Sequence, residues 1–376
     1  MDKDILIRKY SLGDEARISK LLSMYFDNIK DTADWRRLYQ ESPYGEAIIS
    51  LAEAPSSKEL IGHYAILRLP LLFFGKNIKA GKGEGSALDP LALKRAIPPD
   101  ARLNQDIFQG LVEFALENGL KEGMEIICTN PNTLALKAHL DTGHLELKHK
   151  FRIYLFIISK EYSLYLAGKL IKNKKLSNLA GKLTWYLLRI LHMASLKISY
   201  RKNNIGLHPC DSFEGRLKKT IDALAAENRC ISMQPSADYL NWKLSPASFK
   251  KFIVNNGHMD IGYLILQVRT TEQGYLEANL LDYAFKPQYW QEFGKTISRV
   301  LEFALQEKCD YLRVDHMFDY KERFRISRYL SRLFFISRED RRNIVLYLSN
   351  KLKAQKEDIL DVRNWLFTDL YFELSQ

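Results

Sequence analysis

The sequence predicts a two-domain α/β protein, and the prediction rests on length, composition and an internal repetition. The chain has 376 residues, of which 46% are hydrophobic and 12% aromatic. This length exceeds that of one typical domain, and this composition is enough to fill two buried cores. Short patterns of the first half recur in the same order in the second half, so we expect two copies of one unit in which helices flank a central sheet.

Three pairs of matching patterns make up the repetition. The first is a tryptophan followed closely by Ser-Pro, the second is an Ile-Gly pair inside an apolar run, and the third is the sequence Glu-Phe-Ala-Leu. The pairs are Trp35 with Trp242, Gly62 with Gly262, and Glu113 with Glu302. Their offsets of 207, 200 and 189 residues are close to one another. Insertions in loops between two copies of one α/β unit explain such small differences.

The elements of the first half follow from apolar periodicity and from turn residues. The expected strands cover residues 5–10, 47–51, 60–69, 85–88, 124–129 and 151–158. One expected helix begins at residue 11, one spans 105–117, and a short one opens at Asn130. The stretch from Gly85 to Gly143 therefore forms a strand, a basic loop over 91–103, a helix and a second strand. In such a crossover unit the loop is the usual place for phosphate or a cofactor.

The positive charge of the chain belongs mainly to one segment between the two halves. The formal net charge is +11, and nine lysines and arginines with no acid lie between Tyr162 and Cys210. Apolar residues recur there at helical spacing, which predicts one or two basic amphipathic helices. We interpret them as a bridging hairpin that buries its apolar face on both domains; an anionic membrane surface or nucleic acid is the alternative partner. Charges interrupt every apolar run well before a membrane-spanning length.

These observations predict three segments and a cellular setting. The first domain covers residues 1–160, the basic helical linker 161–212 and the second domain 213–376. The cysteines are scattered without metal-binding spacing, and the sequence shows no signal peptide; they are Cys128, Cys210, Cys230 and Cys309. We therefore expect a cytoplasmic protein with reduced thiols, without a bound metal, and with peripheral contact at the inner face of the membrane as an open possibility.

At one passage the residues resemble a known family. Asn130-Pro131-Asn132 follows a strand, and a short helix then leads to His139 and Gly143. This passage, with the order of elements around it, resembles the GNAT superfamily of N-acyltransferases, and the duplication resembles its tandem members. Residues 364–368 are also similar to the closing strand of those members. The resemblance implies that each domain contains a mixed central sheet that is splayed open between two strands.

The resemblance also implies an activity and a binding site. Acetyl-CoA or another acyl-CoA would lie in the gap of the sheet and give its acyl group to an amine, such as an amino sugar or a cell-envelope precursor. A backbone N–H near Leu88 would polarise the thioester, and Asn130 and Asn132 would lie beside the cofactor. The pyrophosphate would be bound where the loop enters the following helix. The residues that we expect there are Lys94, Arg95, Arg102, Asn104 and Gln105.

The loop departs from the pattern of the family. Family members have glycines at this place, which let the backbone wrap around a pyrophosphate. The present chain has no glycine between Gly85 and Gly110. The corresponding loop of the second half, around Lys286 and Pro287, has one lysine and no glycine either. If one half binds CoA, the first half is the better candidate.

Two residues are candidates for acid–base chemistry, and each has an ordinary structural interpretation. Glu84 begins the strand before the loop and lies where some family members have a carboxylate base; the alternative is a solvated glutamate at a strand end. His139 takes the position of the family's acid tyrosine; the alternative is a packed histidine without a chemical role. Tyr39, Tyr239 and Trp242 could line an acceptor pocket between the domains or belong to the cores.

The sequence is also compatible with two other functions. A transferase of the same duplicated fold that takes its group from aminoacyl-tRNA would use the basic linker to contact RNA. A tandem domain without catalysis, acting as a binding scaffold, would explain the loop that lacks glycine.

Overall fold

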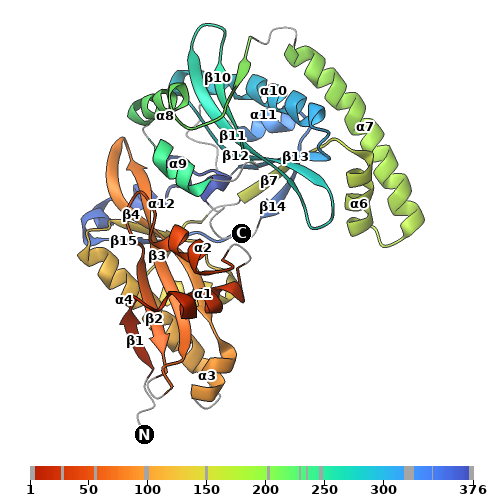
Figure 1. Cartoon of the computed structure of the whole chain (residues 1–376). Helices are drawn as coiled ribbons and strands as arrows, with labels where there is room; N and C mark the ends of the chain where they lie inside the picture. The colour runs from red at the N-terminus through yellow and green to blue at the C-terminus, as the bar shows by residue number, and fades with distance from the viewer. Residues whose placement is uncertain are drawn as a thin grey trace.

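The computed structural model describes residues 5–26, 29–54, 57–96, 101–148, 151–200, 204–227, 230–233, 236–244, 249–316, 326–340 and 342–371. These residues form two mixed sheets, each with helices on both faces (Figure 1). The predicted fold class, an α/β chain with two helix-flanked sheets, is therefore confirmed.

The first sheet has seven strands in the order β1-β2-β3-β4-β5-β15-β6. Their bounds are β1 Leu6–Lys9, β2 Ile48–Glu53, β3 Leu60–Phe73, β4 Lys76–Leu88, β5 Ile126–Thr129, β15 Val345–Leu348 and β6 Leu145–Glu146. Two short strands extend it at the far end of β3, namely β9 (Ile231–Met233) and β16 (Trp365–Leu366). Strands β4 and β5 pair in parallel, whereas β5 and β15 are antiparallel.

The second sheet repeats this arrangement in the order β8-β10-β11-β12-β13-β7-β14. Its strands are β8 Gly206–Cys210, β10 Phe249–Asn255, β11 Asp260–Thr270, β12 Leu276–Phe285, β13 Tyr311–His316, β7 Phe151–Ile157 and β14 Ile336–Asp340. Again the fourth and fifth strands pair in parallel, and the sixth is antiparallel to the fifth. The expected repetition is thus a repetition of sheet topology.

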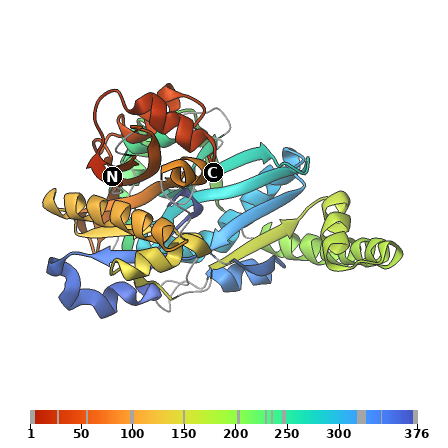
Figure 2. The ribbon, with the colours of Figure 1, turned by 90° about the horizontal axis from the view of Figure 1, so that it is seen from below.

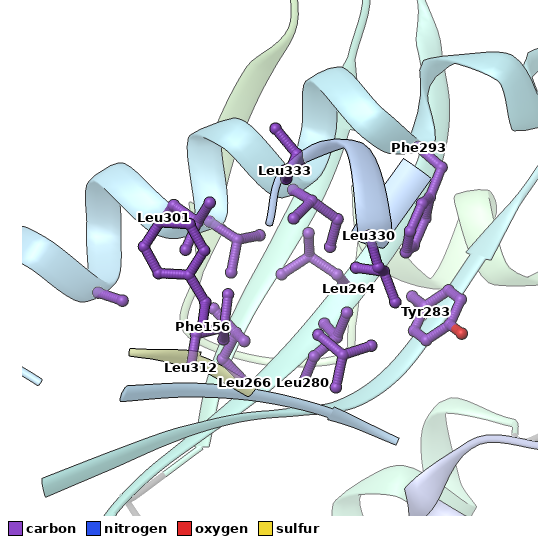
Figure 3. Packing of buried hydrophobic residues seen from close by; sticks show 14 of the residues in the cluster. Phe156, Leu264, Leu266, Leu280, Tyr283, Phe293, Leu301, Leu312, Leu330 and Leu333 are labelled. Carbon is purple, nitrogen blue, oxygen red and sulfur yellow. The ribbon is translucent and has the colours of Figure 1, made fainter. Parts of the chain in front are cut away.

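Each sheet takes its sixth strand from the other half of the chain. Strand β7 comes from the end of the first half but pairs with β13 and β14. Strand β15 comes from the second half but pairs with β5 and β6. Figure 3 shows Phe156 of β7 among Leu264, Leu266 and Leu312 in the core of the second half. The strand expected at 151–158 exists, but it does not close the first sheet.

Each half of the chain therefore contributes a strand to the sheet of the other half. Residues 364–368, which resemble the closing strand of tandem family members, contribute the two-residue strand β16 to the first sheet. The predicted boundaries at residues 160 and 213 describe the order of elements along the chain and stay a prediction. Backbone pairing crosses both of these boundaries.

The helices cover the faces of both sheets. They are α1 Glu15–Ser23, α2 Thr32–Tyr39, α3 Pro90–Ala96, α4 Ala101–Lys121, α5 Thr133–Asp141, α6 Lys160–Leu170, α7 Lys174–Tyr200, α8 Arg216–Glu227, α9 Ala237–Lys243, α10 Phe293–Gln306, α11 Ile326–Arg332 and α12 Lys356–Leu360. Four shorter 3-10 helices are η1 Pro287–Glu292, η2 Asn350–Gln355, η3 Val362–Asn364 and η4 Asp369–Tyr371. On the first sheet α4 packs against one face, and α1 and α2 pack against the other. On the second sheet α10 and α11 oppose α8 and α9.

The helices that carry the repeated tryptophans meet at the contact between the halves. Trp35 lies in α2, and its counterpart Trp242 lies in α9. Trp242 Nε1 donates a hydrogen bond of 2.6 Å to the carbonyl of Arg37, and the Arg37 guanidinium donates to the carbonyl of Trp242 at 3.3 Å. The two copies therefore use corresponding helices to contact each other.

The region expected as a basic loop is mostly helical. Helix α3 occupies 90–96, and α4 begins at Ala101, four residues before the expected start of that helix. Residues 97–100 lie outside the part of the chain that the structure describes. The expectation of an open loop from 91 to 103 is therefore wrong for most of its length.

The linker forms two helices that pack against each other, as the spacing predicted. Ser163 Oγ of α6 donates a hydrogen bond of 2.9 Å to the carbonyl of Gly181 in α7. In both views the α6–α7 hairpin stands at one end of the molecule, beyond the second sheet (Figures 1 and 2). Our interpretation that its apolar face is buried on both domains is wrong, because large apolar side chains along α7 are exposed.

Candidate active site

The first sheet opens between β4 and β5, as the resemblance implies. The two strands pair in parallel from Ala80 opposite Ile126 to Gly83 opposite Thr129. Beyond that point β4 continues to Leu88, whereas β5 ends and the chain turns into α5. The separation leaves backbone groups of both strands without a partner strand, which a bound chain-like ligand can use. We call this place the first splay.

A β-bulge in β4 accompanies the separation of the strands. The pairing of β3 with β4 shifts register between His63 and Ala65, and Gly85 has a φ of 63°. A Cβ atom on Gly85 would lie 2.4 Å from Tyr39 Oη, so neither the backbone conformation nor the space admits a larger residue. His63 Nδ1 lies 2.7 Å from the Gly85 carbonyl oxygen and holds the bulge from the neighbouring strand.

One face of the first splay carries a buried ion pair. Lys82 Nζ and Glu84 Oε2 are 2.7 Å apart, and the two side chains are 1% and 9% exposed. Residues two apart in a strand point to the same face, which explains why these side chains meet. Glu84 is therefore not a solvated glutamate at a strand end, because it lies within a long strand and is buried beside a cation.

Three buried tyrosines from distant parts of the chain lie within the electrostatic range of Glu84. Tyr39 comes from α2, Tyr239 from α9 of the second half and Tyr371 from the C-terminal segment. Burial is the main cause that raises the pKa of each, and the negative charge of Glu84 adds to it. Lys82 Nζ also lies 5.3 Å from the centre of the Tyr371 ring. All three phenols therefore stay protonated at neutral pH.

The opposite face of the splay holds polar atoms that lack partners. Both side-chain atoms of the Asn130 amide and both ring nitrogens of His139 are buried without a hydrogen bond among the described residues. The Tyr64 hydroxyl lies close to Gly83 on this face. A Cβ atom added to Gly83 would be only 2.1 Å from Tyr64 Oη and 2.9 Å from Thr129. A buried polar group without a partner costs on the order of 1 to 3 kcal/mol, so this group of atoms fits a polar ligand.

His139 is packed and uncharged. Its ring is fully buried and lies 5.7 Å from that of Tyr64 and 4.8 Å from that of His144. Burial, with a smaller contribution from His144, lowers the pKa of His139 to about 3. At neutral pH this imidazole has no extra proton to give, so its titration does not favour the acid role that the resemblance implied.

The other predicted binding residues are distributed over β4, α3, α4 and α5. Asn132 is exposed and caps α5, because its Oδ1 accepts from the N–H groups of Leu134 and Ala135 at 3.0 and 2.9 Å. The carbonyl of Leu88 accepts a hydrogen bond of 2.7 Å from Tyr25. Arg95 forms an ion pair with Glu59, and Lys94 is exposed on α3. Arg102, Asn104 and Gln105 belong to the first turns of α4, and their side chains lie outside the described residues.

The corresponding splay of the second sheet is covered by the chain itself. Strands β12 and β13 pair as far as Leu280 opposite Val314, and β12 then continues to Phe285. The C-terminal segment lies against β12 there: Asn279 Nδ2 donates to Asp369 at 2.8 Å, and Thr368 Oγ1 donates to Asp282 at 2.7 Å. The C-terminal segment therefore supplies protein partners for Asn279 Nδ2 and Asp282, although Asn279 Oδ1 is buried without a hydrogen bond among the described residues.

A cavity of about 400 Å³ lies between the halves. Tyr44, Arg68 and Lys79 line it from the first half, and Asp222 and Ser236 line it from the second. The ring of Tyr44 is 5.5 Å from that of Tyr239, one of the tyrosines within the electrostatic range of Glu84. The cavity thus lies beside the paired part of β3 and β4, before the point at which β4 and β5 separate.

Sequence reasoning missed Lys82, Tyr64 and Tyr371. The expected strand began at Gly85, so Lys82 and Glu84 were not recognised as neighbours on one strand face. The alternation of charge with glycine over residues 81–85 was the available signal. For Tyr371 there was none, because nothing local shows that the C-terminal segment returns to the first sheet.

Comparison with known proteins gives structural likeness without sequence likeness. No protein-family profile and no curated protein matches the sequence. A GCN5-related N-acetyltransferase from Anabaena variabilis superposes with a TM-score of 0.60 at 11% identity, over 93% of this chain and 74% of that one. A probable N-acyltransferase of unknown function from Enterococcus faecalis gives 0.60 at 8% identity, over 92% and 73%. A GCN5-related N-acetyltransferase from Kribbella flavida gives 0.53 at 11%, over 92% and 71%.

The splayed sheet and these superpositions define the class of fold. The chain has the fold of the GCN5-related N-acetyltransferases, with two mixed sheets of the same topology. The resemblance predicted from the sequence is confirmed at the level of the fold.

Four buried histidines predict that acid will destabilise the protein. Burial is the main cause that lowers the pKa of His63, His144 and His192 to about 4 and that of His139 to about 3. Since an unfolded histidine has a pKa near 6.5, the unfolded chain binds more protons below that pH. The free energy of unfolding should fall as the pH falls from about 6.5 to 4, as urea denaturation at several pH values will show.

A matched pair of variants isolates this contribution. His192 stacks on Phe156 with 3.6 Å between ring centres, and phenylalanine fits the same place. His192→Phe should reduce the loss of stability between pH 7 and 4.5 by on the order of 2 kcal/mol. The exposed His258→Gln should keep the wild-type slope. Equal slopes for wild type and His192→Phe would contradict the assignment.

Proposed function

We propose that the first half of the chain is an acyl-CoA-dependent N-acyltransferase. Acyl-CoA would bind at the first splay, and the second half would complete the site for an amine acceptor. The observation that carries this proposal is the difference between the two splays. The first holds the unpartnered amide of Asn130, whereas the second is covered by Thr368 and Asp369.

The residues of the first splay fit the pantetheine part of acyl-CoA. That part is an extended chain with two amides, which can pair with strand edges and with a buried side-chain amide. Asn130 offers both a donor and an acceptor, and β4 offers the backbone beyond Gly83. The glycine-free loop does not weaken this part of the fit, since it concerns the phosphates and lies partly outside the described residues.

Residues from both faces of the first splay supply the proton chemistry of acyl transfer. An amine attacks the thioester carbonyl carbon, the carbon–sulfur bond breaks, the amine loses a proton and the thiolate gains one. Lys82 engages Oε2 of Glu84 at 2.7 Å, and Oε1 is the oxygen that would accept the amine proton. Tyr64, whose hydroxyl lies between Gly83 and Thr129, is the proposed donor to the thiolate in place of His139.

The acceptor would enter through the cavity between the halves. The cavity carries Asp222 beside Lys79 and Arg68, and the ring of Tyr44 contacts that of Tyr239. Hydroxyl groups and a carboxylate suit an amine that also bears hydroxyl groups, as an amino sugar does. The acceptor class rests on this match of polar groups.

Calorimetric titration with acetyl-CoA tests the proposal directly. Binding should be measurable for the wild-type chain, and Asn130→Ala should weaken it by roughly fivefold to tenfold because one paired amide is lost. Asn118→Ala is the matched control, since Asn118 lies at the far end of α4 and hydrogen-bonds to the carbonyl of Phe114. No binding at millimolar acetyl-CoA would overturn the proposal and favour a scaffold or a tRNA-dependent enzyme.

A further inference from the structure

Helix α7 presents an apolar stripe to solvent along its length. The stripe consists of Leu176, Leu179, Leu183, Leu187, Ile190 and Met193, each between 52% and 66% exposed. Their spacing of three or four residues places them on one side of the helix. A contiguous row of this kind on a folded protein marks an interaction surface.

The opposite side of α7 already has its packing partners. Ser177, Gly181 and His192 are buried, and Trp185 Nε1 donates a hydrogen bond of 3.2 Å to the carbonyl of Ile158. The stripe is therefore not a face that could turn inward by rotation of the helix. Both views show that the hairpin lies clear of the first sheet, so that sheet does not cover the stripe (Figures 1 and 2).

Cations follow one border of the stripe. Lys175, Lys182 and Arg189 recur every seven residues, which is about two turns, and all three are exposed. Leu170, at the end of α6, adds a large apolar side chain that is 85% exposed. The sequence from residue 162 to 210 has nine cations and no acid.

We propose that α7 docks the protein on an anionic lipid surface, with the apolar stripe inserted among the acyl chains and the cations at the headgroups. A helix with one apolar face and one basic border is the form that lies in a membrane interface. The described helices include none that is long and apolar enough to cross a membrane. This inference is independent of the proposed acyl transfer.

The charge of the segment decides between possible occupants. A second copy would bring two strongly cationic segments together, which costs free energy. Nucleic acid would satisfy the cations but would leave six large apolar side chains against phosphate and water. An anionic lipid surface satisfies both parts of the pattern.

Co-sedimentation of the full chain with phosphatidylcholine vesicles, with and without phosphatidylglycerol, tests the proposal. Binding should require phosphatidylglycerol and weaken as salt is raised. The triple variant Lys175→Gln, Lys182→Gln and Arg189→Gln should bind roughly 10- to 100-fold more weakly. The double variant Leu183→Gln and Ile190→Gln, which keeps the charge, should also lose binding.

A charge-matched control separates docking from general attraction. Lys351, Lys353 and Lys356 are exposed in η2 and α12, and their change to glutamine should leave vesicle binding as it is in the wild type. Equal binding to neutral vesicles, no binding at all, or an equal loss in this control would overturn the proposal. So would a dimer that the Leu183→Gln and Ile190→Gln variant dissociates, or salt-sensitive RNA binding that survives in that variant, if vesicles are not bound.

Discussion

Replacing Glu84 by glutamine is expected to lower kcat for acyl transfer by about 10²- to 10⁴-fold, the usual contribution of a positioned general base. Glutamine has the same shape but cannot accept the proton that the attacking amine must lose. Affinity for acetyl-CoA should stay within about twofold, because Glu84 already pairs with Lys82 and the proposed cofactor contact is the unpartnered amide of Asn130. Release of free thiol from acetyl-CoA, measured with the best of a panel of amines, gives kcat.

A second buried glutamate provides the control for this variant. Glu277 lies in β12 of the second sheet, is 3% exposed and forms an ion pair with Arg269 at 3.0 Å. Glu277→Gln should change stability in the same way as Glu84→Gln but should leave kcat unchanged. If both variants lose activity equally, the effect of Glu84 is structural. If neither does, Glu84 is not the base.

The two-fold repetition of the fold was predictable because short sequence patterns at corresponding positions indicate it. Trp35 and Trp242, like Gly62 and Gly262, fill corresponding places, and each place selects its residue through nearby packing. At Gly262 a Cβ atom would lie 2.4 Å from the carbonyl oxygen of Ala284 on the neighbouring strand, so this position requires a glycine that is visible in the sequence. The length and composition of the chain were then enough to predict two hydrophobic cores.

The exchange of β7 and β15 could not be predicted from the same patterns. Strand β7 is apolar on both faces, as Ile153, Leu155 and Ile157 contact α6 while Tyr154 and Phe156 enter the core beside α10. Such a pattern predicts a buried strand but contains nothing about which sheet accepts it. Partner choice depends on the path of the whole chain, which here includes a helical hairpin between the halves.

The residues of the candidate site also divide into those that have a local sequence signal and those that do not. Asn130, Asn132 and Glu84 could be proposed from the sequence because they follow or belong to strands that it marks clearly, and the cap role of Asn132 depends only on adjacent residues. Tyr239 of the second half and Tyr371 of the C-terminal segment lie within the electrostatic range of Glu84. Contacts over such sequence distances leave no local signal, so an aromatic residue of the core and one of the site look alike.

The crossing of the chain between the sheets gives the prediction with the largest effect on stability. Arg342 lies between β14 of the second sheet and β15 of the first. Its guanidinium binds Asp315 of β13, Asp369 of the C-terminal segment at 3.0 Å and Asp340 at 2.5 Å. Asp315 and Asp369 are each 1% exposed. Burial opposes ionisation, but Arg313 and Arg342 outweigh it and hold the pKa of Asp315 below its usual range.

Arg342→Met should therefore lower the free energy of unfolding by about 3 to 5 kcal/mol, because it leaves buried carboxylates without their shared cation. Arg363→Met is the control: Arg363 pairs with Asp361 on the surface, is 64% exposed and should cost at most about 1 kcal/mol. Urea denaturation at pH 7.5 measures both.

The pH dependence of Arg342→Met distinguishes lost charge pairing from lost packing. Without Arg342 the pKa of Asp315 rises in the folded state, so the folded variant takes up a proton at a higher pH than the wild type. Protonation removes part of the penalty, and the difference in stability between wild type and variant should shrink as the pH falls from 7.5 to 5. A difference that stays constant over this range would mean that Arg342 stabilises the crossing by packing alone.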